Sequence, residues 1–142
     1  MSFYFAVIHL SVTSLILSFY DLRNHKIYQK HLIVALLLTI PFISIKSIAF
    51  GVLNFLFFLA LHHLSRRGIG MGDVRLSFLI GIYVGSFAGD WRTIVYANLI
   101  SWILAGLIAT TLIILKRTSL RGRLAFAPFM FVGLYSGLIL QR

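Results

Sequence analysis

The carboxylates of this chain are few enough to be considered one by one. Its 142 residues include three aspartates, Asp21, Asp73 and Asp90, and no glutamate. Two aspartates at the same depth on different helices are the minimum for an aspartyl protease, in which one carboxylate activates water and the other, protonated, donates to the scissile carbonyl. Such a pair resists double ionisation and shares a proton. Because the chain has no cysteine, a disulfide, a thiolate metal site and a cysteine nucleophile are excluded.

The elements that must position these aspartates are long apolar runs. Hydrophobic residues make up 60% of the chain and charged residues 11%, and the mean hydropathy is +0.98, whereas the apolar share of a soluble domain is nearer half. We therefore predict an all-α, polytopic integral membrane protein with about six crossings, since a crossing takes roughly 20 residues. One membrane domain, residues 1–142, accounts for the length. The helices expected from the apolar runs are residues 3–20, 31–46, 47–64, 74–89, 93–115 and 124–140.

The basic residues divide the connections between two membrane faces. If all six helices cross, residues 21–30, 65–75 and 116–123 share one face, while 40–47, 89–92 and both termini share the other. Basic residues near span ends are retained in the cytoplasm, so we expect the first face to lie inside and both termini outside. A net charge of +10 then reflects topology, and nucleic acid is not an expected partner. The first face carries ten of the thirteen Lys and Arg residues: Arg23, Lys26, Lys30, Arg66, Arg67, Arg75, Lys116, Arg117, Arg121 and Arg123.

Two of the three aspartates fall on the expected cytoplasmic face. Asp21 directly follows the first helix, and Asp73 directly precedes the fourth. Asp90 falls on the opposite face, where it cannot meet them, and serves as an internal control. Two plain alternatives remain open: Asp73 as the N-cap of the fourth helix, and Asp21 as a solvated loop residue that balances nearby basic side chains.

A glycine run precedes Asp73. Gly68, Gly70 and Gly72 alternate, and glycine allows the backbone to approach another chain closely. We expect a peptide substrate to lie against Gly70, Met71 and Gly72. If the fourth helix begins near residue 74, the positive end of its dipole stabilises ionised Asp73 and favours Asp73 as the base.

Other polar and small residues inside the apolar runs have structural interpretations. Asn54 and Asn98 are expected to form interhelical hydrogen bonds, and Gly81, Gly85 and Gly106 to allow close helix contacts.

Two adjacent histidines, His62 and His63, end the third helix. They lack an evident third ligand, so we expect interfacial anchoring rather than a metal site, and no cofactor.

Three segments, taken in order, resemble the type IV prepilin peptidases, membrane aspartyl proteases of the GxGD class. That family has an aspartate followed six residues later by isoleucine and proline, and then a G-x-G-D followed by a basic residue and leucine. Tyr28 and Gln29 depart from the family's usual proline and asparagine. The matching segments here are Asp21-Leu22-Arg23-Asn24-His25-Lys26-Ile27, Gly70-Met71-Gly72-Asp73-Val74-Arg75-Leu76 and the proline-containing Ala125-Phe126-Ala127-Pro128-Phe129.

The resemblance implies an activity, a substrate and a location. Asp21 and Asp73 would be the catalytic pair, and the substrate would be a prepilin or pilin-like precursor of a type IV pilus or protein-secretion system. Cleavage would remove a short basic leader at the cytoplasmic face of the inner membrane. The family's cysteine-containing N-methylation region has no counterpart here, so we expect a protease-only form without methyl transfer.

Two functions of other classes stay open. A catalytically inactive membrane subunit that binds pilin precursors would tolerate replacement of Asp21 and Asp73. A small transporter would place ionisable groups near the bilayer midplane, whereas these aspartates lie at an edge.

Overall fold

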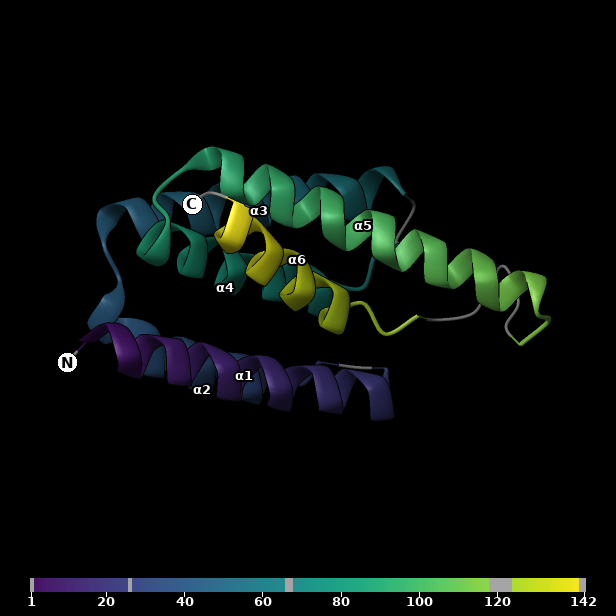
Figure 1. Ribbon diagram of the computed structural model, residues 1–142, viewed down its shortest axis with the longest axis horizontal. Coiled ribbons are helices and arrows are strands. Elements are labelled where there is room, and N and C mark those ends of the chain that lie inside the picture. The colour runs from purple at the N-terminus through teal and green to yellow at the C-terminus, as the bar shows by residue number, and fades with distance from the viewer. Residues whose placement is uncertain (1, 26, 66–67, 118–123, 141–142) are drawn as a thin grey trace.

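The part of the chain that the structure describes folds into six α-helices and one 3₁₀ turn. The computed structural model describes residues 2–25, 27–65, 68–117 and 124–140, and this described part contains no strand. The predicted all-α class and the number of helices are confirmed. In chain order (Figure 1), the elements are α1 (Ser2–Asn24), α2 (Gln29–Thr39), η1 (Ile40–Phe42), α3 (Ile45–Leu64), α4 (Met71–Phe87), α5 (Trp91–Ile114) and α6 (Ala127–Leu140).

Two of these helices, α3 and α5, are long and apolar enough to cross a membrane. Helix α6 has 14 residues, about 21 Å at 1.5 Å per residue, which is less than the roughly 30 Å of a hydrocarbon core. Six crossings therefore remain a prediction. Large apolar side chains such as Leu15, Leu53 and Ile103 are exposed on the outside of the bundle, as expected of a protein surrounded by lipid.

The helices form two hairpins with a further helix pair beside them. Helices α3 and α4 pack along each other, as do α5 and α6, and α1 and α2 form a separate layer that contacts α6 and α4. Figure 1 places the N-terminal end of α1 and the C-terminal end of α6 at one end of the bundle, and the C-terminal ends of α1, α3 and α5 at the other. The predicted grouping of the connections agrees with this alternation, while the compartment that each end faces remains a prediction.

Glycines set the close approach of α3 and α4. A Cβ atom on Gly81 would lie 2.5 Å from the carbonyl oxygen of Phe50 and 2.7 Å from the Cα of Gly51. At Gly85 a Cβ atom would collide with the backbone of Ser47. The predicted close contacts at Gly81 and Gly85 are thus confirmed, and they make α3 and α4 one tightly packed unit.

Glycines also allow α5 and α6 to pack closely, but at positions that were not predicted from the sequence. A Cβ atom on Gly133 would collide with Ser101 and Ala97, and one on Gly137 would lie 2.9 Å from the carbonyl oxygen of Thr93. The prediction for Gly106 is wrong, because no atom of the described residues lies within 4 Å of a Cβ atom there.

A polar cluster fixes the register of three helices. The Asn54 amide donates to the Ser77 carbonyl oxygen at 2.9 Å, and the Asn98 amide donates to the Asn54 side-chain oxygen at 2.8 Å. Both predicted interhelical hydrogen bonds are confirmed. They tie α3 to α4 and α5. Asn54 is buried, and an unpaired amide there would be costly.

The boundary between the second and third predicted helices needs correction. The sequence placed it between residues 46 and 47, but the chain leaves the helix through the 3₁₀ turn that contains Pro41 and re-enters at Ile45. Ser44 and Ser47 form a reciprocal capping box there. Two satisfied backbone donors therefore define the start of α3.

Candidate active site

Asp21 is buried inside the last turn of α1. The helix continues to Asn24, beyond the predicted end at residue 20, and His25 follows in the left-handed region with φ 49°. Only 4% of the Asp21 surface is exposed, and its carboxylate accepts a 2.9 Å hydrogen bond from the Ala127 backbone N–H. The alternative of a solvated loop residue is therefore wrong.

The partner of Asp21 is the N-terminus of α6. This helix begins at Ala127, with Pro128 in its first turn, a position that proline favours. The preceding residue, Phe126, has no side-chain acceptor, so Asp21 supplies from α1 the cap that α6 lacks in its own sequence. The proline marks this helix start in the sequence, but it does not indicate that Asp21 lies against it.

Opposing effects act on the carboxyl group of Asp21, which lies just beyond the predicted span 3–20. Burial raises its pKa above the ordinary value, while the N–H groups of Ala127 and Phe126 and the charge of His25 act to lower it. These donors and the positive end of α6 stabilise the ionised form.

Asp73 is the third residue of α4, because the helix begins at Met71 rather than near residue 74. The N-cap is Gly70, so the interpretation of Asp73 as the N-cap is wrong. The Gly70 N–H hydrogen-bonds to the Asp73 carboxylate, which is one half of a capping box. The other half is missing because glycine has no side chain.

The pKa of Asp73, which precedes the predicted span 74–89, is raised from 3.8 to about 7. Burial is the main cause, the charge of Asp21 adds to it, and the Gly70 hydrogen bond opposes both. The expectation that the helix N-terminus would keep Asp73 ionised is therefore wrong, because desolvation and a neighbouring carboxylate outweigh that stabilisation.

The two sequence segments meet through Ile27 and Gly72. A Cβ atom on Gly72 would lie 3.2 Å from the Cβ of Ile27, in the connection between α1 and α2. A Cβ atom on Gly70 would lie 3.1 Å from an oxygen of Asp73. Both glycines thus give room to atoms of the protein itself, while Met71 is exposed. That a substrate also lies against residues 70–72 remains a prediction.

Asp90 lies at the other end of the bundle. It is the N-cap of α5, and its side chain accepts a 3.1 Å hydrogen bond from the Arg92 N–H. Asp90→Asn can therefore serve as the internal control, because asparagine is an equally good N-cap.

His62 differs from the interfacial anchor that we expected. It is buried, and its Nδ1 lies 2.6 Å from the carbonyl oxygen of Ile69, in the connection that leads to Asp73. Nothing in the sequence indicates this contact beyond the nearness of the two segments. His63 beside it is exposed. Within the part of the chain that the structure describes, no three residues of a ligating type gather to hold a metal ion.

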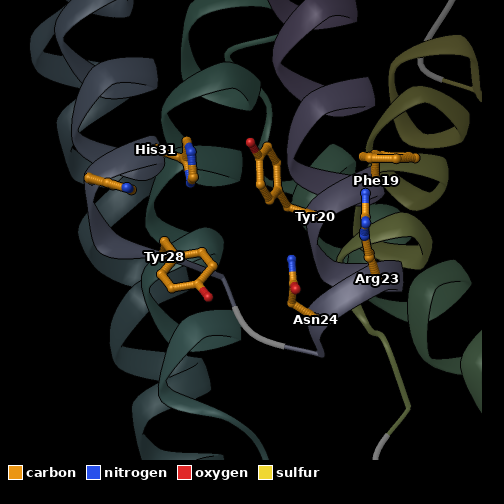
Figure 2. Close-up of a pocket in the computed structure, with 7 residues that line it drawn as sticks. Phe19, Tyr20, Arg23, Asn24, Tyr28 and His31 are labelled. Atoms are coloured by element: carbon orange, nitrogen blue, oxygen red, sulfur yellow. The ribbon is translucent and has the colours of Figure 1, made fainter.

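Two cavities flank the carboxylates without including them in their linings. One, of about 450 Å³, lies between α1 and α2 (Figure 2) and is lined by Phe19, Tyr20, Arg23, Asn24, Tyr28, Lys30 and His31. There the rings of Tyr20 and His31 stack with centroids 4.5 Å apart. The other, of about 430 Å³, lies between α2, α3 and α4 and is mostly apolar, with Gln29 and Arg75 as its polar members.

Comparison with known proteins identifies the family. The model of the type IV leader peptidase family matches residues 8–114, which include Asp21 and Asp73 but not α6. No curated protein matches the chain, and no solved structure does. Because the match covers well over half of the sequence, the chain belongs to the type IV leader peptidase family.

Proposed function

We propose that this protein is an aspartyl endopeptidase that removes the basic leader from type IV prepilin or pilin-like precursors. Membership of the family supports a peptidase with pilin-precursor substrates. The observation that carries the aspartyl mechanism is that Asp21 is close enough to Asp73 for its charge to raise the pKa of Asp73. These are the aspartates of the two segments that resemble the family's signature regions.

The surroundings of the two carboxylates favour different roles. Asp21 receives N–H donors from the start of α6 and feels the charge of His25, so it is the better candidate for the ionised base. Asp73, with a pKa of about 7, holds its proton near neutrality and is the better acid. This assignment reverses the one favoured by the sequence, and it follows the rule that environments push the pKa values of a catalytic pair apart.

The proposed reaction needs only water and the two carboxyl groups. Asp21 takes a proton from water as the water oxygen attacks the scissile carbonyl carbon, and Asp73 gives its proton to the carbonyl oxygen. The resulting diol returns one hydroxyl proton to Asp73 as the C–N bond breaks. Asp21 gives its proton to the departing amine, so both groups regain their starting states.

We place the reaction at the cytoplasmic face of the inner membrane, with both termini outside. The asymmetric distribution of Lys and Arg supports this orientation. The two aspartates lie at the end of the bundle where α1 ends and α4 begins. Of the ten basic residues predicted for this face, Lys26, Arg66, Arg67, Arg121 and Arg123 lie outside the described residues. We propose that a lipid bilayer surrounds the rest of the helical surface.

The test is leader cleavage in membranes that contain the protein and a panel of prepilin precursors. Asp21→Asn and Asp73→Asn each keep the size of the side chain and remove the carboxylate, so we expect each to lower cleavage by at least about 100-fold. Asp90→Asn is the matched control and should cleave at the native rate. Full activity of either Asp21→Asn or Asp73→Asn would rule out the pair, and a native chain that binds precursors but cleaves none would favour the inactive subunit.

A further inference from the structure

The peptide group between Ile69 and Gly70 is bonded on both of its sides. Its C=O, from Ile69, accepts a 2.6 Å hydrogen bond from His62. On its other side, Gly70 lies against Asp73: a Cβ atom on Gly70 would be 3.1 Å from an oxygen of the Asp73 carboxylate, and the Gly70 N–H hydrogen-bonds to that carboxylate. One rigid peptide plane therefore stands between the histidine on α3 and the aspartate on α4.

His62 is the donor in its hydrogen bond with Ile69. A carbonyl oxygen can only accept, so Nδ1 of His62 must carry the hydrogen. His62 is 8% exposed, so water competes little for this bond. The helix that carries His62 is also held in place, because Asn54 hydrogen-bonds to Ser77 and the glycine contacts hold α3 against α4.

We infer that His62 is a positioning residue for Asp73: its ring N–H orients the Ile69–Gly70 peptide group so that the Gly70 N–H points at the Asp73 carboxyl group. Bonding at the C=O also polarises the peptide and strengthens the N–H as a donor. The importance of this arrangement for catalysis rests on the proposed function, but the arrangement itself does not.

Among the described residues, few other groups act on Asp73. Asp21 acts from α1, and His25 acts in turn on Asp21. Arg75 is on the same helix as Asp73, but its guanidinium donates to Gln29 on α2 at 3.3 Å. A change at His62 that leaves these groups in place should therefore reach Asp73 through the Gly70 N–H.

The direct test is the titration of Asp73 in detergent micelles, followed by NMR of the aspartate side-chain carboxyl carbons. With three aspartates and no glutamate in the chain, ¹³C-aspartate labelling gives three such signals, and the signal lost in Asp73→Asn identifies the one needed. We expect His62→Leu to raise the midpoint of Asp73 by about 0.5 to 1 pH unit, because a hydrogen bond to the ionised form is weakened.

Two variants separate this effect from general damage. His62→Asn can place an amide N–H where Nδ1 lies, so it should restore the native midpoint, and His63→Leu removes the exposed neighbour and should leave the midpoint unchanged. An unchanged midpoint in folded His62→Leu would overturn the inference. So would equal shifts in His62→Leu and His63→Leu.

A double-mutant cycle keeps the inference testable if His62→Leu folds poorly. Gly70 has φ −69° and ψ 143°, which suit proline, so Gly70→Pro removes the N–H, and Gly70→Ala controls for the added Cβ. His62→Asn can place an amide N–H where Nδ1 lies, whereas the longer side chain of His62→Gln cannot. If His62 acts through the Gly70 N–H, the Asp73 midpoints of these two variants will differ in the Gly70→Ala background and coincide in the Gly70→Pro background. A difference of equal size in both backgrounds would contradict the inference.

The consequence for catalysis is read separately. In cleavage assays, the pH above which His62→Leu loses activity should rise by the same amount as the midpoint of Asp73. If the aspartate variants retain cleavage, the proposed function fails while the titration still decides the role of His62. If the titration shows no coupling but cleavage requires both aspartates, only the inference fails.

Discussion

The two helices that carry the proposed catalytic pair are held in the bundle by different means. Helix α4 is buried almost continuously from Val74 to Val84 and packs against α3 with its glycines in backbone contact. Helix α1 buries one face, including Leu10 and Leu17, and leaves apolar side chains such as Leu15 exposed.

Helix α1 relies on polar contacts along its length instead. His9 bonds to Tyr83 at 3.3 Å, Ser14 bonds to Tyr135 at 3.1 Å, and Asp21 accepts from α6. Rigid packing thus fixes Asp73, whereas a few hydrogen bonds fix Asp21. We therefore expect the distance between the two carboxylates to be more sensitive to substitutions around α1 than to substitutions around α4.

The largest effect is expected where α3 and α4 touch. Gly81→Val places a side chain against the backbone of α3, and we expect a loss of about 3 kcal/mol in the free energy of unfolding from overpacking. Thermal unfolding in detergent measures it. Gly106→Val is the matched control, since a Cβ atom there meets nothing within 4 Å. Equal destabilisation by both variants would show that the α3–α4 contact is not specially tight.

The next effect concerns pH. Because the pKa of Asp73 is raised from 3.8 to about 7, its protonated form survives up to near neutrality and is lost as the pH rises further. If Asp73 is the acid, the cleavage rate should fall about tenfold per pH unit above that value. Rates measured at constant ionic strength check this. A rate that stays level to pH 9 or so would remove Asp73 from the role of acid.

A smaller effect separates the structural role of Asp21 from its chemical one. Asp21→Leu leaves the Ala127 N–H without an acceptor and should cost about 1 kcal/mol of stability, as the loss of a helix cap does. Asp21→Asn keeps an acceptor oxygen and should cost less, while still abolishing cleavage. Unfolding measurements on both variants test the difference, and equal stability of the two would refute the capping role.

The smallest effect is expected from one polar anchor of α1. Ser14→Ala removes the bond to Tyr135 and should cost about 0.6 kcal/mol, the usual size for such a bond between membrane helices. Ser11→Ala is the control, because the Ser11 hydroxyl bonds within α1 to the Val7 carbonyl oxygen. Thermal unfolding of the pair gives the comparison, and a larger loss in Ser11→Ala would contradict the assignment of Ser14 as an anchor.

The sequence predicted the helices well because helices depend on local patterns. Apolar runs and their polar breaks located six helices, and Asn54 and Asn98 stood out as polar residues in apolar surroundings. The pairing of Asp21 with Ala127 joins residues 106 positions apart, and no local pattern contains that information. Gly133 was missed and Gly106 wrongly chosen for a similar reason, since a glycine in a helix does not reveal which face meets a neighbour.

The protonation state of Asp73 could not be predicted from the sequence either. From the sequence, Asp73 was a residue near a helix start, which favours ionisation. The extent of burial and the presence of a second carboxylate decide the opposite outcome, and both depend on tertiary structure. His62 illustrates the same limit, because its partner is a backbone carbonyl group rather than a recognisable side chain.

The most direct test of a coupled aspartate pair is the titration of Asp73 in the native chain and in Asp21→Asn. The aspartate carboxyl signals of ¹³C-labelled protein provide it without any substrate. We predict a midpoint of about 7 in the native chain and a lower one in Asp21→Asn, since the charge that opposes ionisation of Asp73 is gone. A native midpoint near the ordinary 3.8, or one that Asp21→Asn does not move, would contradict the pair.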